Sequence, residues 1–185
     1  MSGASIRIEV DDAEVRRAFA GLAALGEDMT RPLADIGSSL VQSTALRFEA
    51  ERGPGGIPWK KSGRALAQGG QTLSDTGRLK ASITHRAGAK ELLVGTDTRY
   101  AAIHQFGGTI RAKGKALAFS LPWLKRRGDS GMRFVKSVTI PARPFLGLDA
   151  GDREMIAETI AAHVARIAGA GGSATSPGSA GRGQA

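Results

Sequence analysis

The residue types best suited to chemistry gather in one segment, Arg99 to Ile110, which reads RYAAIHQFGGTI. It contains the single tyrosine of the chain, His104, Gln105 and the pair Gly107 and Gly108. An imidazole beside a glycine turn can serve as a general base in an enzyme. The same residues can instead form a buried corner in which polar groups satisfy one another. An active site and a structural corner are therefore the two competing hypotheses.

The partners that catalysis would need are missing from the sequence around this segment. His85, His104 and His163 lack the spacing of a zinc site, and the chain has no cysteine. No G-x-S-x-G motif is present, and GGTIRAKGK lacks the spacing of a phosphate-binding Walker loop. We therefore predict no catalytic residue, no metal and no cofactor. The residues interpreted as a structural corner are Tyr100, His104, Gln105, Phe106, Gly107 and Gly108.

Positive charge is concentrated in two windows of a chain whose net charge is +9. Residues 52–90 and residues 111–136 each carry eight basic side chains and one acidic side chain. Windows of this kind are either solvated loops or a surface for a polyanion or an acidic partner. Each window also holds a tryptophan beside a proline, which can anchor a loop or stack on a base. The expected electropositive contacts are Lys60, Lys61, Arg64, Arg111, Lys113, Lys115, Lys125, Arg126 and Arg127.

Length and composition predict one domain without a membrane segment. The chain has 185 residues, of which 41% are hydrophobic. The first residues lack the apolar core of a signal peptide, and no apolar run approaches the roughly 18 to 20 residues of a membrane helix. We expect a single domain over residues 1–167, a flexible Gly/Ala/Ser-rich tail over residues 168–185, and synthesis in a cytoplasm.

Hydrophobic periodicity predicts an α+β fold. A small antiparallel β-sheet is expected to pack against two or three helices, with long basic loops between the elements. Ser74 or Asp75 is expected to cap a short helix, and Asp149 or Asp152 the last one. So small a sheet makes a weak core for a monomer, which favours an oligomer. The expected strands cover 5–10, 83–87, 91–95, 109–110, 116–121 and 134–140. The expected helices cover 13–25 and 30–50, and a last helix, which begins after Asp149 or Asp152, ends at about residue 167.

Three blocks of the sequence together resemble a known family. LSDTGRLKASI at 73–83, VGTDTRYAAIHQFGG at 94–108 and IPARPFLGL at 140–148 occur in the order and spacing of the phage virion morphogenesis proteins. These are also called tail completion proteins and include a Mu-like form. GGIPWKK at 55–61 is similar to the loop after the second helix of that family. The resemblance covers roughly residues 5–167.

The resemblance implies a structural virion protein of a tailed phage or prophage, without enzymatic activity. It implies a role in head–tail joining or tail completion, as a subunit of a hexameric ring at the neck. The location would be the head–tail interface of the virion, and the host cytoplasm during assembly. Expected partners are identical subunits, adjacent neck, portal-adaptor or tail-tube proteins, and DNA in the channel, but no membrane. The expected ring contacts are Trp59, Trp123, Arg143 and Phe145.

Two alternatives remain open from the residues alone. A sequence-independent nucleic-acid-binding protein would bind duplex DNA tightly, with a steep dependence on salt. An enzyme such as a nuclease or a cell-wall hydrolase would lose its activity when His104 is replaced by alanine.

Overall fold

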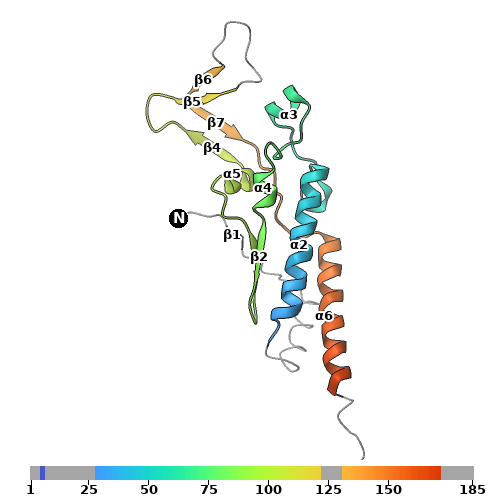
Figure 1. The fold of residues 1–185 in the computed structure, drawn as a ribbon. Helices are drawn as coiled ribbons and strands as arrows, with labels where there is room; N and C mark the ends of the chain where they lie inside the picture. Colours follow the sequence, from blue (N-terminus) through green and yellow to red (C-terminus); the bar gives the residue numbers. More distant parts are fainter. Residues whose placement is uncertain (1–4, 7–27, 122–130, 172–185) are drawn as a thin grey trace, which may run out of the picture.

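The computed structural model describes residues 5–6, 28–121 and 131–171 (Figure 1). Two long helices, α2 (Thr30–Ala50) and α6 (Ala150–Gly171), run antiparallel and contact each other. A three-stranded antiparallel sheet packs against α2, and a β-ribbon extends away from the helical pair. The α+β fold expected from the sequence is therefore confirmed.

Helix α2 forms because its apolar residues recur at helical spacing. Leu33, Ile36, Leu40 and Phe48 are all buried, as the periodicity predicts. The helix ends at Ala50 and is followed by the capping residue Glu51, which adopts a left-handed conformation with φ of 53°. Its carboxylate accepts hydrogen bonds from the backbone N–H of Thr72 and from the ammonium of Lys61, so the strained residue also ties down the loop that follows.

The three-stranded sheet lies on one side of α2 with strand order β1-β3-β2. Its strands are β1 (Ser5–Ile6), β2 (Thr84–Ala87) and β3 (Leu92–Gly95). Val94 turns into the core and is 2% exposed. Gly37 allows helix and sheet to approach closely, because a Cβ at that position would lie 2.5 Å from the ring of His85. A side chain at residue 37 would therefore separate the two layers.

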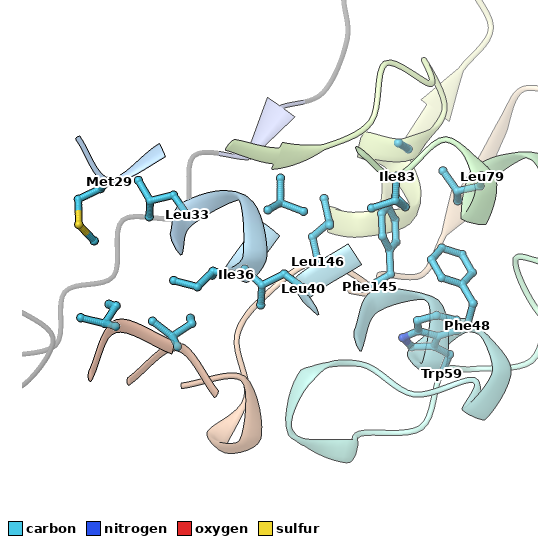
Figure 2. Packing of buried hydrophobic residues seen from close by; sticks show 14 residues of the cluster. Met29, Leu33, Ile36, Leu40, Phe48, Trp59, Leu79, Ile83, Phe145 and Leu146 are labelled. Carbon is cyan, nitrogen blue, oxygen red and sulfur yellow. The ribbon is translucent and has the colours of Figure 1, made fainter. Parts of the chain in front are cut away.

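An aromatic cluster closes the core at the end where α2 terminates (Figure 2). The ring centroid of Phe48 lies 5.4 Å from that of Trp59 and 5.3 Å from that of Phe145. The indole N–H of Trp59 donates to the carbonyl of Pro144 at 2.9 Å. Aromatic rings at these separations contribute packing energy beyond the area they bury. The cluster joins α2, the first basic window and residues 141–149.

A buried ion pair joins α2 to the start of α6. The Arg47 guanidinium contacts the carboxylates of Asp149 and Asp152, and Arg47 is 7% exposed. Asp149 and Asp152 also accept each other's backbone N–H, both at 3.0 Å. This reciprocal arrangement satisfies N–H groups at the helix start, so the sequence prediction of a cap at these aspartates is correct.

The β-ribbon, called the β arm below, comprises residues 108–121 and 131–140. Its outer half pairs β5 with β6, and its inner half pairs β4 with β7, both antiparallel. The Ala112 N–H donates to the Lys136 carbonyl at 2.9 Å, which links the two halves. The arm thus continues as one long hairpin. Its strands are β4 (Gly108–Arg111), β5 (Leu117–Ser120), β6 (Met132–Val135) and β7 (Ser137–Ile140).

Several sequence expectations differ from the structure. The strand expected over 134–140 is two strands interrupted at Lys136, where the two halves of the arm meet. Neither Ser74 nor Asp75 caps a helix, because α4 (Arg78–Ala81) begins later and follows Gly77 in a left-handed conformation. The helix expected over 13–25 lies outside the described residues. Expected loops contain η1 (Pro54–Gly56), α3 (Gly63–Gln68) and α5 (Ala101–Phe106).

Replacing Arg47 by alanine is expected to lower the free energy of unfolding by about 3–5 kcal/mol, because Asp152 then stays buried without a counter-charge. Lys80→Ala is the control, since it removes an exposed ion pair with Glu49. The control should cost at most about 1 kcal/mol. Urea unfolding followed by circular dichroism measures both. Equal losses would show that the Arg47 pair has no special role in joining the helices.

Candidate functional site

The segment RYAAIHQFGGTI folds into α5, a glycine corner and the first strand of the β arm. Gly107 ends the helix with φ of 70°, and a Cβ there would lie 2.6 Å from the backbone nitrogen of Ala142. Gly108 follows with φ of 147°. Both positions therefore require glycine, for their backbone conformation and for the close approach of residues 141–142. The corner sets the direction in which the arm leaves the body.

Gln105 is the most fully used side chain of this corner, at 8% exposed. Its Oε1 accepts from the backbone N–H groups of Phe145 and Leu146, each at 3.0 Å. Its Nε2 donates to the carbonyl of Leu146 at 2.8 Å. One amide thus satisfies three buried backbone groups of a segment that belongs to no strand or helix.

The backbone carbonyl of His104 accepts a hydrogen bond, whereas the Nδ1 of its ring has no partner among the described residues. Its carbonyl accepts the Arg143 N–H at 2.7 Å, and its ring meets the edge of Tyr100 at a centroid distance of 5.9 Å. Within the described part of the chain, its buried Nδ1 has no hydrogen-bond partner. Burial lowers the pKa of His104, and the positive charge of Arg143 lowers it further. An imidazole kept neutral in this way, with no carboxylate or nucleophile bonded to it, lacks the partners of a catalytic dyad.

The residues expected to form ring contacts lie inside the single chain. Trp59 and Arg143 are each 6% exposed, and Phe145 is fully buried. Their polar groups are engaged within the subunit, since the Nε of Arg143 donates to the carbonyl of Lys60 at 2.7 Å. Contact of these three side chains with a neighbouring subunit stays a prediction, and within the single chain they are buried. Trp123 lies outside the described residues.

The expected electropositive residues divide into three groups. Lys61 and Arg64 are engaged within the chain, in ion pairs with Glu51 and Asp75 respectively. Lys125, Arg126 and Arg127 lie outside the described residues. The remaining four are exposed and form no ion pair within the described ranges: Lys60 on the body, and Arg111, Lys113 and Lys115 on the β arm and its bend.

Sequence reasoning missed the apolar surface of the arm. Phe134 is 69% exposed, Ile110 44% and Met132 39%, while Phe106 at the arm's base is 66% exposed. Exposed apolar groups that gather on one feature mark interaction sites. The available signal was the alternation of MRFV at 132–135, which puts Met132 and Phe134 on one face of a strand. Without knowing that the ribbon has only two strands, that face could be assigned to a core.

Within the described ranges, no group of three or more His, Asp or Glu residues is placed to hold a metal ion. A search of the same ranges finds no helix that is both long and apolar enough to cross a membrane.

Comparison with known proteins agrees with the three sequence blocks. The model of the phage virion morphogenesis family matches residues 10–165. This chain belongs to that family. Among the relatives, the Mu-like prophage FluMu G protein 2 of Haemophilus influenzae is 35% identical over 157 residues, 84% of this chain and 93% of that protein.

Two further relatives are less similar to this chain. The putative capsid assembly protein G of Escherichia phage Mu is 29% identical, covering 81% of this chain and 88% of that protein. Tail completion protein S of Escherichia phage P2 is 26% identical, covering 72% of this chain and 82% of that protein. No solved structure matches the chain at comparable significance.

Replacing Gln105 by leucine is expected to lower the free energy of unfolding by about 3 kcal/mol or more, because each buried backbone group left unpaired costs about 1–3 kcal/mol. Gln105→Glu keeps both acceptor bonds and loses the donor, so it should lower the free energy of unfolding by less than Gln105→Leu does. Gln42→Leu, on the exposed side of α2, should change stability by less than about 0.5 kcal/mol. Thermal and urea unfolding measure all three. A Gln105→Leu protein as stable as the wild type would remove the structural role of the corner.

Proposed function

We propose that the protein is a ring-forming subunit at the head–tail junction of a tailed phage or prophage, acting in tail completion and not in catalysis. The observation that carries this proposal is the β arm, a two-stranded ribbon that leaves the body with its apolar side chains exposed. The membership of the virion morphogenesis family supports the structural role. The names of the relatives, capsid assembly and tail completion, support the stage of assembly.

The arm needs a partner for a physical reason. Isolated two-stranded ribbons are marginally stable in water, and stability comes from a further strand or from packing on another surface. Both halves of the arm are two-stranded, and Phe134 has little of its own chain to pack against. A neighbouring copy could supply the missing surface. A head-to-tail contact of this kind, repeated with a rotation that closes on itself, forms a ring.

The location and partners follow from this role. A ring at the junction would lie in the virion, and in the host cytoplasm during assembly, between neck, portal-adaptor or tail-tube proteins. DNA passes through such a junction, and exposed cations there would contact phosphates without reading sequence. We expect that contact from Arg111, Lys113 and Lys115, which are exposed on the arm and its bend.

Mass photometry of the purified protein is expected to show a ring, with the mass of a hexamer. Phe134→Glu should shift the population to monomers, because it places a charge in the apolar contact of the arm. Leu46→Glu is the matched control, at an exposed leucine on α2. Both variants should keep wild-type unfolding midpoints. Absence of the protein from intact particles, together with normal head–tail joining in a knockout phage, would contradict the proposal.

DNA contact by the arm predicts a specific salt response. Replacing Arg111, Lys113 and Lys115 together by glutamine should flatten the slope of log affinity against log salt by about 0.9 for each cation that contacts a phosphate. The control replaces Arg31, Lys90 and Arg153, which are exposed outside the arm, and changes net charge equally. Fluorescence anisotropy with a duplex at several salt concentrations measures the slopes. Equal slopes in both triple variants would place the arm away from DNA.

A further inference from the structure

A cleft of about 400 Å³ opens at the base of the β arm, among α3, α4, α5 and residue 143. It is called the arginine pocket below. Its volume falls in the range of about 300–1,000 Å³ that is common for ligand sites. Three arginines from separate parts of the chain contribute to its lining, together with a tyrosine and a histidine. These residues are Arg64, Arg78, Arg143, Tyr100 and His104.

Arg143 makes the pocket unusual, because it is a buried cation that has no counter-ion among the described residues. It is 6% exposed, and its Nε donates to the Lys60 carbonyl at 2.7 Å. Among the described residues no carboxylate pairs with it. Burial lowers the pKa of Arg143, which reports the cost of holding this charge away from water. A guanidinium in such a place is stabilised when an anion supplies the missing charge.

The rest of the wall adds to the positive field. Arg64 pairs with Asp75 at 3.4 Å, and that carboxylate is 72% exposed. Arg78 is exposed and has no ion pair within the described part of the chain. Of the charged residues that line the pocket, three are therefore guanidinium groups and one is a carboxylate. The surplus is positive, and converging charges of one sign attract the opposite sign.

The ring of His104 lines the same pocket. Its Nδ1 is buried and has no partner within the described ranges, so this atom does not face the open cleft. Burial and the positive charge of Arg143 lower the pKa of His104. An anion beside Arg143 would offset that repulsion and favour the protonated ring.

We propose that the arginine pocket binds a carboxylate carried by an acidic segment of a neighbouring protein in the assembled particle. Planar guanidinium groups hold carboxylates through two parallel hydrogen bonds. The recessed position of Arg143 favours a side chain that can enter the cleft. The phosphates of a duplex lie on the surface of a broad rod and do not reach a guanidinium so deeply buried. The class of partner rests on the proposed assembly role, whereas the chemistry of the pocket does not.

The test uses the full chain and a blocked tetraglutamate peptide, titrated by calorimetry at low ionic strength. Wild-type protein is expected to bind the peptide, and Arg78→Gln to weaken binding about tenfold or more. Arg78 is exposed, so its replacement should leave the fold intact. Arg143→Lys keeps the charge and removes the planar fork, and should weaken binding as well. Arg153→Gln removes an equal charge from α6 and should bind like the wild type.

Two results would overturn the proposal. One is a loss of selectivity: the Arg78→Gln and Arg153→Gln proteins bind tetraglutamate equally well, or the wild type binds a blocked tetraglutamine peptide as tightly as tetraglutamate. The other is that a short DNA duplex competes with the peptide for the wild type and binds the Arg78→Gln protein more weakly, which would assign the pocket to phosphates. Mass photometry tests the ring independently of the pocket. If the protein binds the peptide through Arg78 but forms no rings, only the proposed ring is refuted. If it forms rings but does not bind the peptide, only the proposed pocket is refuted.

Discussion

The fold depends on how residues 141–149 are held, because this segment contains two prolines and forms neither strand nor helix. Its backbone groups must therefore be satisfied by side chains from other parts of the chain. Gln105 bonds Phe145 and Leu146, and Trp59 bonds the Pro144 carbonyl. Arg47 donates to the carbonyls of Phe145 and Gly147 at 3.3 and 2.8 Å. Three separate parts of the chain are joined to one another through this irregular segment.

The same constraint supplies Gln105, which looked like a candidate for chemistry, with backbone partners. Its amide oxygen accepts two backbone N–H groups and one of its two N–H donors is used, so its position is set by the segment that it holds. The glycines beside it serve the close approach of residues 141–142 and the turn into the arm. The body is thus rigid where it meets the arm, so the direction of an otherwise exposed ribbon is determined by buried contacts.

Much of the body could be predicted from the sequence, since local periodicity decides it. The face of α2 with Leu33, Ile36 and Leu40, and the aspartate cap of α6, depend on residues near in sequence. The burial of Trp59, Arg143 and Phe145 could not be predicted, because it results from contacts across about 85 to 100 residues. The pairing of Lys61 with Glu51 and of Arg64 with Asp75 likewise exists only when the loops are folded. The number of basic residues counted in a window of the sequence is therefore larger than the number of cations left unpaired in the fold.

The division between body and arm bears on how a subunit of this kind joins an assembly. Exposed apolar and basic side chains occur together on the arm, whereas the buried charges at the junction of the two long helices pair with each other through Arg47. Among the described residues no carboxylate pairs with the buried Arg143, and an acidic partner in the proposed arginine pocket would offset that charge. Binding energy of that origin is available only in the assembly, which favours a neighbour that carries the acidic group over one that does not.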